Sequence, residues 1–194
     1  LDPTLNETAD YLHATVHWHV DGAQDMVPTR ASLLTARVLS KVGGQTEFAN
    51  TYAAYDDLPS AKKSQVDCLR VIHSQEYIQR AMHPNPTEEQ LARWRQHSEQ
   101  SHPMAWTHRS GRKSLLLGLT AGRIEGMSDA DGRKVIEEMQ AWATQPQFVY
   151  RHEWAVGDLI IWDNTGVMHR VEAYPADSGR LLSRTTLVGE EPIA

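Results

Sequence analysis

The 194-residue chain has a single cysteine, Cys68, and lacks any apolar run near the roughly 20 residues that a membrane-spanning helix needs. One cysteine excludes an intramolecular disulfide and is typical of a reducing compartment. We expect Cys68 to be a small core residue. A secretory signal pattern is also missing at the start of the chain. These absences predict a cytoplasmic protein that contacts no membrane.

The chain also lacks an excess of basic residues. Lysine and arginine number 19 against 25 aspartates and glutamates, so the formal net charge is −6. Binding to a nucleic-acid backbone needs a concentrated basic surface, and this composition argues against it. The length and the 40% of hydrophobic residues are those of a chain that buries its own core, which predicts a single domain over residues 1–194.

Short strand patterns and turn signals divide the chain. We expect a hairpin over 105–118 that turns at Ser110-Gly111. Helices are expected after two capping residues, Asn50 and Ser128, over 51–58 and 128–145, with a further short helix within 60–69. The remaining strand patterns cover 31–40, 46–50, 70–74, 147–154, 158–164 and 180–189. Many short strands with few helices predict a mainly β protein of the α+β type, a β-sandwich or jelly roll with flanking helices.

The segment 83–103 differs from its surroundings because it is polar and carries three prolines. Thr87 and Gln90 have the spacing of a capping box, which predicts a short helix inside the segment. A polar stretch of this length between strands is longer than a turn requires. We therefore interpret 83–103 as a lid over an active site; a solvated loop without a role is the alternative.

Histidine is abundant, with ten copies, and "HWHVDG" places His17, His19 and Asp21 on alternate positions. If this segment is a strand, all three side chains point to one face. A His-x-Asp pair with a third ligand from a distant strand would form a facial triad that leaves other metal positions open. The motif alone is a weak signal, and it leaves open which of the three residues bind a metal.

A second group of residues lies in the C-terminal part. The apolar run before "WDN" is followed by a short loop to His169, and Arg180 and Arg184 lie eleven and fifteen residues after that histidine. Residues four apart in a strand face the same way, so both arginines would point inward. Two inward guanidinium groups are costly unless each meets an anion.

Several stretches together carry a family resemblance. "HWHVD", "GGQTEFANTYAAYDDLP", "HPMAWTHRSGRKSLLLG", "ATQPQFVYRHEWAVGDLIIWDNTGVMHR" and "GRLLSRTTLVGE" closely resemble the taurine dioxygenase/2,4-dichlorophenoxyacetate dioxygenase family over nearly the whole chain. The resemblance implies a double-stranded β-helix, a cupin-like jelly roll. It also implies an oxygenase that uses Fe(II), 2-oxoglutarate and O2, releases succinate and CO2, and hydroxylates a small organic anion.

The resemblance also implies roles for individual residues. The metal triad matches His19, Asp21 and His169, with His17 as a neighbour outside it. Thr46 and Arg180 match the residues that hold the distal carboxylate of 2-oxoglutarate, for which an arginine fork is suited. Arg184 matches the partner of the substrate's anionic group. Asp163 and Asn164 are expected to order the turn that aims His169.

Two departures from the family pattern concern the substrate. Thr120 stands where the taurine enzyme has a pocket phenylalanine, and the stretch around "WDN" looks closer to the aryloxyalkanoate branch. Only 18 residues precede His19, so we expect that an N-terminal segment of the family is missing here. The oligomeric state is left open, a homo-oligomer included.

Two other classes remain as alternatives. A zinc hydrolase would use His17, His19 and His169, because zinc sites often have three histidines and an open position. A non-catalytic cupin-like binding domain is the other, since a fold does not determine a function.

Overall fold

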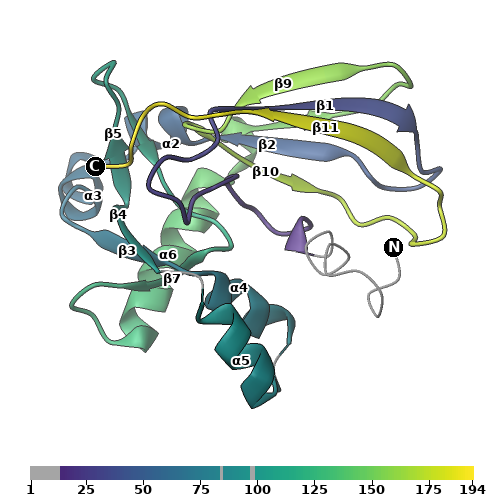
Figure 1. Ribbon diagram of the computed structural model, residues 1–194. Coiled ribbons are helices and arrows are strands. Elements are labelled where there is room, and N and C mark those ends of the chain that lie inside the picture. Colours follow the sequence, from purple (N-terminus) through teal and green to yellow (C-terminus); the bar gives the residue numbers. More distant parts are fainter. Residues whose placement is uncertain (1–13, 84, 97–98) are drawn as a thin grey trace.

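Two three-stranded antiparallel sheets form one part of the protein, at the upper right in Figure 1. The computed structural model describes residues 14–83, 85–96 and 99–194. One sheet has the strand order β11-β1-β9, from Leu181–Leu187, Ala31–Val38 and Leu159–Asp163. The other has the order β10-β2-β8, from Val167–Val171, Thr46–Asn50 and Val149–His152.

The two sheets face each other through aromatic side chains. The Phe48 ring of β2 lies 5.4 Å from the Trp162 ring of β9, centroid to centroid, and the Trp162 ring lies 4.7 Å from that of His169 on β10. Successive residues of a strand alternate between faces, and Trp162 is 6% exposed while Ile161 is 60% exposed. This arrangement confirms the predicted mainly β jelly roll with flanking helices.

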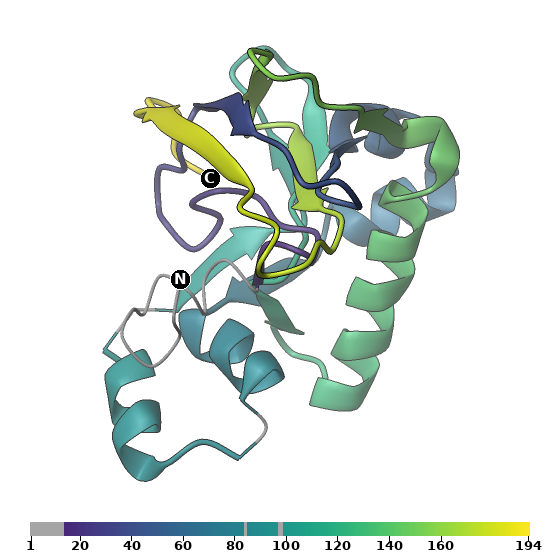
Figure 2. The same ribbon diagram turned by 90° about the vertical axis from the view of Figure 1, so that its right-hand side faces the viewer.

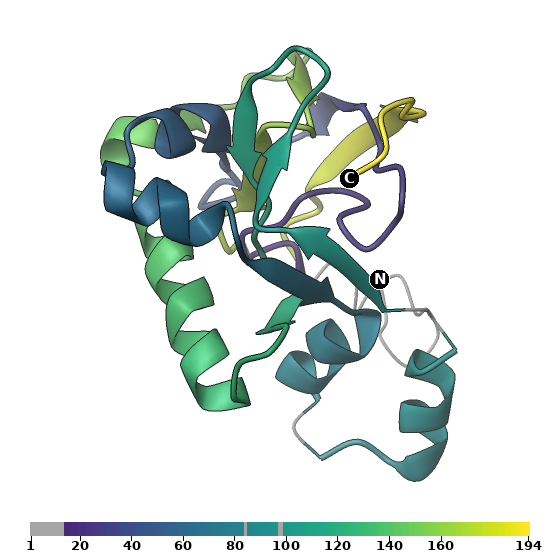
Figure 3. The same cartoon turned by 90° about the vertical axis from the view of Figure 1, so that its left-hand side faces the viewer.

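A second group of elements packs beside the jelly roll (Figures 2 and 3). It contains a third sheet of order β4-β3-β7, from Gln100–Pro103, Arg70–His73 and Ala121–Ile124, and a hairpin of β5 (Ala105–Thr107) and β6 (Lys113–Leu115). Helices α2 (Thr51–Asp56), α3 (Ser60–Val66) and α6 (Asp129–Ala143) and the 3₁₀ turn η1 (Pro146–Phe148) complete it. A hydrophobic core cluster extends from here to Ala49 of β2 and Met168 of β10 and includes Trp106, Leu115, Leu117, Ile136 and Met139.

Local sequence signals explain where these elements begin. The Asn50 side chain accepts a hydrogen bond from the Ala53 amide at 3.0 Å, which caps α2. The Ser128 hydroxyl accepts from the Asp131 amide at 3.2 Å and caps α6. Such side-chain acceptors satisfy backbone N–H groups that a helix leaves unpaired. Both predicted caps and the predicted hairpin are therefore confirmed.

The predicted lid segment contains more regular structure than expected. The capping box of Thr87 and Gln90 is present and begins helix α5 (Glu88–Trp94). Residues 100–103, however, are strand β4, so this end of the predicted lid belongs to a sheet. A further helix, α4 (Gln75–Met82), precedes the segment and packs with α5. Residues 84 and 97–98 lie outside the described residues, and the lid function stays a prediction.

The interpretation of Cys68 as a core residue is wrong. Its side chain is exposed in the turn after α3, because Val66 and Leu69 are the residues of this turn that pack against the core. Across the described ranges, no helix is long and apolar enough to cross a membrane.

Candidate metal centre

The segment "HWHVDG" is not a strand. His19 forms one isolated antiparallel bridge, in which its amide donates to the His169 carbonyl at 3.0 Å and its carbonyl accepts from the His169 amide at 2.9 Å. The chain then turns at Asp21, and Gly22 has a φ of +75°. The condition under which all three side chains would share one strand face is therefore not met. Asp21 is buried, whereas His17 is exposed.

His169 follows the short turn after "WDN" and lies on strand β10, a strand that was not predicted from the sequence. Its backbone partner in β2 is Phe48, and its own amide and carbonyl reach His19 on the other side. Two histidines that are 150 positions apart thus become direct backbone neighbours, and their ring centroids lie 4.2 Å apart.

The side chains of His19, Asp21 and His169 converge at one point. Each offers one ligand atom, and these atoms all lie within 4.8 Å of one another. The Nε2 of His169 is 3.7 Å from the Oδ2 of Asp21. In the part of the chain that the structure describes, this is the only such group of three histidine, cysteine or acidic side chains. It does not include His17, so the geometry does not support the three-histidine alternative.

Burial favours the neutral form of both imidazoles. Desolvation lowers the pKa of His169 well below its usual value, and the neighbouring His19 and Arg184 act in the same direction. Desolvation also lowers the pKa of His19, although the Asp21 carboxylate partly opposes it. The Nδ1 of His19 donates to the His17 carbonyl at 2.8 Å, which leaves the Nε2 lone pair available. Neutral imidazoles with a free lone pair are the form that binds a metal.

A hydrogen-bonded network of the buried Ser32, Asn164 and Trp162, together with the more exposed Arg184, holds the Asp21 carboxylate. Its Oδ2 accepts from the Ser32 hydroxyl at 2.6 Å and from the Arg184 guanidinium at 2.6 Å. The Asn164 amide donates to Ser32 at 3.0 Å, and its carbonyl oxygen accepts from Trp162 at 2.9 Å. Asn164 therefore supports Asp21 through Ser32, whereas Asp163 orders the turn by accepting from the Thr165 amide and hydroxyl.

The other carboxylate oxygen of Asp21, Oδ1, is buried and finds no hydrogen-bond partner among the residues that the structure describes. An unpaired buried anionic oxygen is costly, and a bound cation would satisfy it. Two neutral imidazoles and one carboxylate are the facial triad typical of non-haem iron(II) oxygenases, which leaves positions for further ligands. The residues present therefore fit an Fe(II) ion.

Arg180 contacts Gly44, which precedes Thr46 by two residues. The Arg180 guanidinium donates to the Gly44 carbonyl at 2.8 Å and lies over the Tyr174 ring at 4.7 Å. A Cβ at Gly44 would be 2.8 Å from the Arg180 Nε, and the φ of +83° there also favours glycine. Arg180 precedes β11, so the two arginines do not share one strand as expected.

The surroundings of these two residues leave hydrogen-bond donors unused. Burial lowers the pKa of the Arg180 guanidinium, and no carboxylate of the described ranges forms an ion pair with it. The buried Thr46 hydroxyl accepts from Trp154 at 3.0 Å and so keeps its own hydrogen for another acceptor. A half-buried cation beside a free hydroxyl donor is suited to a carboxylate.

A small cavity of about 60 Å³ opens directly beside the metal centre. His19, Asp21 and Thr120 line it from one side. Thr120 is buried, and its hydroxyl is 2.7 Å from the Nδ1 of His73. The opposite side comes from α4 through Gln75, Ile78 and Gln79. No pattern in the sequence indicates the α4 residues, and Ser32 is recognisable only as a polar residue inside an apolar strand.

Comparison with known proteins shows to which family the chain is similar in sequence and in fold. A model of the family described as "Taurine catabolism dioxygenase TauD, TfdA family" matches residues 2–186. The alpha-ketoglutarate-dependent 2,4-dichlorophenoxyacetate dioxygenase of Burkholderia sp. (strain RASC) is 41% identical over 177 residues, covering 89% of this chain and 58% of that protein. An alkylsulfatase of Acinetobacter baylyi is 34% identical, covering 89% and 56%.

A crystal structure of AAD-2 in complex with Mn(II) and N-oxalylglycine matches with a TM-score of 0.89 and 36% sequence identity, covering 96% of this chain and 73% of that chain. The chain spans a little under three fifths of the length of the 2,4-dichlorophenoxyacetate dioxygenase and of the alkylsulfatase.

Proposed function

The chain belongs to the TauD/TfdA family of taurine catabolism dioxygenases, and from this premise we propose that it is an Fe(II)- and 2-oxoglutarate-dependent dioxygenase that hydroxylates a small organic anion. The observation that carries the proposal is the convergence of His19, Asp21 and His169 within 4.8 Å. Relatives named for 2,4-dichlorophenoxyacetate and sulfate esters support the class of reaction.

His19, Asp21 and His169 would hold the iron. Bound Fe(II) supplies the activation of O2 that couples decarboxylation of 2-oxoglutarate, to succinate and CO2, with insertion of one oxygen atom into a substrate C–H bond. The protein's own contribution is positional. Ser32 and Arg184 hold Asp21 in one orientation, and the hydrogen bond from His19 to the His17 carbonyl fixes the tautomer of His19.

Arg180 and Thr46 would bind the distal carboxylate of 2-oxoglutarate. A guanidinium can give two charge-assisted hydrogen bonds to one carboxylate, and the Thr46 hydroxyl can give a third. Support comes from the partly buried Arg180 without a carboxylate partner in the described ranges and from the similar structure that holds Mn(II) together with N-oxalylglycine.

The substrate would be an aryloxyalkanoate, an alkyl sulfonate or a sulfate ester. Arg184 has five N–H donors, so it can keep its contact with Asp21 and still meet the substrate's anionic group. Thr120 and α4 would bound the carbon skeleton in the cavity. If the hydroxylated carbon carries an ether or sulfate oxygen, the product collapses and the bond is cleaved. The single cysteine favours a cytoplasmic location.

The test is succinate release from 2-oxoglutarate by the full-length protein with Fe(II), ascorbate and O2. A panel of aryloxy acids, sulfonates and sulfate esters serves as substrates, with matched uncharged alcohols as controls. We expect release that depends on both iron and at least one anionic substrate. Absence of succinate with every compound would refute the proposal. Product formation with Zn²⁺ and without 2-oxoglutarate would instead favour the hydrolase.

A further inference from the structure

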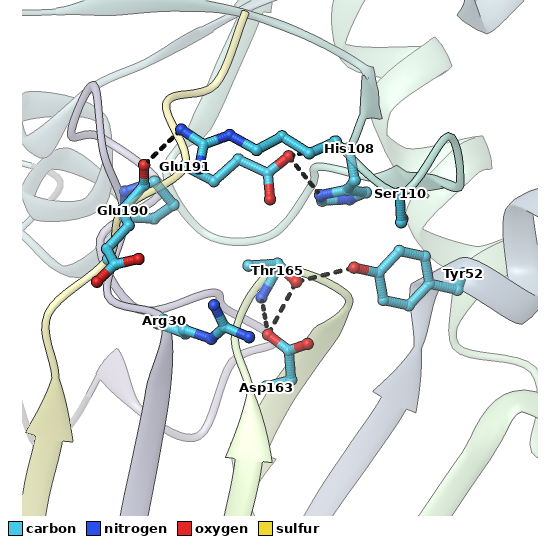
Figure 4. A pocket seen from close by; sticks show the side chains of 11 residues that line it. Arg30, Tyr52, His108, Ser110, Asp163, Thr165, Glu190 and Glu191 are labelled. Carbon is cyan, nitrogen blue, oxygen red and sulfur yellow. Dashed lines mark hydrogen bonds and ion pairs between the residues drawn. The ribbon is translucent and has the colours of Figure 1, made fainter.

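A second pocket, of about 340 Å³, lies at the end of β9, where Asp163 and Thr165 line it (Figure 4). The turn after β9 separates the two sites. Asn164 points to Ser32 and thereby to Asp21, whereas Asp163 and Thr165 line the pocket. No metal ligand and no residue assigned above to 2-oxoglutarate or substrate lines it. The pocket is therefore a separate candidate site.

His108 forms one wall of this pocket, and its hydrogen bonds determine its tautomer. The Ser114 hydroxyl donates its single hydrogen to the Thr165 carbonyl at 2.7 Å. The same hydroxyl is 2.8 Å from the Nε2 of His108, so it must accept there and Nε2 must carry the hydrogen. In the neutral ring the Nδ1 of His108 is consequently an acceptor with a lone pair.

This lone pair lacks a donor. His108 is 5% exposed, and its Nδ1 has no hydrogen-bond partner among the described residues. The group that faces it is the carboxylate of Glu191, with Oε1 at 3.8 Å, and this oxygen already accepts from the Arg109 amide at 2.5 Å. Burial lowers the pKa of His108, so a ring proton does not fill the gap at neutral pH. Two acceptors therefore face each other across a space that a cationic donor would stabilise.

The other charged groups of the lining leave an excess of acceptors. Three carboxylates line the pocket, those of Asp163, Glu190 and Glu191, against the guanidinium groups of Arg30 and Arg109. Arg109 also donates to the Glu190 carbonyl at 2.9 Å. The hydroxyl of Tyr52 contacts that of Thr165, which in turn donates to Asp163. With a neutral His108 the lining carries one net negative charge.

We propose that this pocket binds a small organic ammonium ion, whose N–H groups donate from the pocket side to both the Nδ1 of His108 and the carboxylate of Glu191. A divalent metal fits the pocket less well. Throughout the described part of the chain, three ligand atoms come within 4.8 Å only at His19, Asp21 and His169, so a metal here would have too few close ligands. The volume instead suits an organic ion of several heavy atoms.

The experiment is a titration of the full-length protein with n-butylammonium chloride, followed by the histidine nitrogen resonances in NMR. 1-Butanol and sodium chloride at equal ionic strength are the ligand controls. We expect saturable binding that shifts the His108 Nδ1 signal, with no saturation by either control. Glu191→Gln keeps the shape and the acceptor for the Arg109 amide but removes the charge. We expect it to weaken binding about tenfold or more, as for loss of a charge-assisted hydrogen bond.

Glu125→Gln is the matched control, because Glu125 is an exposed carboxylate outside the pocket. We expect it to bind n-butylammonium as the wild type does. Equal affinity of Glu191→Gln and wild type would overturn the proposal, as would absence of saturable binding. An NMR spectrum with the hydrogen of His108 on Nδ1 would also overturn it, and so would saturation by Zn²⁺ but not by n-butylammonium.

Discussion

Ser32→Ala tests how the protein holds its metal-binding carboxylate. Ser32 is completely buried in β1, and its hydroxyl donates to the Oδ2 of Asp21 at 2.6 Å while accepting from the Asn164 amide at 3.0 Å. The substitution removes one orienting donor but leaves Arg184 in contact with the same oxygen. Loss of such a supporting group costs about 10- to 100-fold in metal affinity, or about 1.4–2.7 kcal/mol.

The same substitution has a second, separable effect. It leaves the buried Asn164 amide without its acceptor, which destabilises the metal-free fold by about 1–3 kcal/mol. Metal affinity is measured by anaerobic Fe(II) titration calorimetry, and the free energy of unfolding by urea denaturation.

Tyr55→Phe is the control, because it removes another hydroxyl that donates to a carboxylate, that of Asp67 at 2.9 Å. We expect it to lower stability without changing metal affinity. If Ser32→Ala binds Fe(II) as tightly as the wild type, the Ser32 hydroxyl does not orient Asp21 for metal binding.

Three further predictions follow from the same structure. His169→Ala should abolish Fe(II) binding while His17→Ala leaves it unchanged, and equal titration curves would contradict the triad. Arg180→Ala should raise the half-saturating concentration of 2-oxoglutarate about tenfold or more, since it removes charge-assisted hydrogen bonds; an unchanged requirement would exclude Arg180 from that site. Burial lowers the pKa of His73 in the folded state to about 3. As the pH falls below about 6.5, the unfolded state therefore takes up a proton on this histidine while the folded state does not. The free energy of unfolding should therefore drop by up to about 1.4 kcal/mol per pH unit in that range. Urea denaturation should show a weaker dependence of this free energy on pH for His73→Gln. An identical dependence would contradict the lowered pKa of His73.

Local signals in the sequence were sufficient for many elements of the fold. The predicted strand 46–50 coincides with β2 (Thr46–Asn50), and the predicted helix 128–145 contains α6 (Asp129–Ala143). These elements are predictable because side-chain caps and apolar periodicity act over a few residues. The capping box of Thr87 was visible for the same reason.

The geometry of the site depends on contacts that no local pattern encodes. Asp21 lies in a turn, not in the strand that alternation suggested, and its partner Ser32 comes from β1. The short loop that leads to His169 was predicted, but strand β10 was not, and pairing of this strand with β2 and His19 fixes the histidine. Such long-range pairing overrides the weak local preference of "GVMHR". The residue pattern alone indicated a metal-binding His-x-Asp pair and an inward Arg180, whereas the full triad with His169, the role of Thr46 and the partner of Arg180 came from the family resemblance.

If His19, Asp21 and His169 form an iron centre, they couple decarboxylation of 2-oxoglutarate to oxidation. This coupling is measured as CO2 release from carboxyl-labelled 2-oxoglutarate by the full-length protein and its Asp21→Ala variant, with and without Fe(II) and O2. We expect release by the wild type that requires both iron and oxygen, and none by Asp21→Ala. Undiminished release by Asp21→Ala, or release by the wild type without iron, would contradict this iron centre.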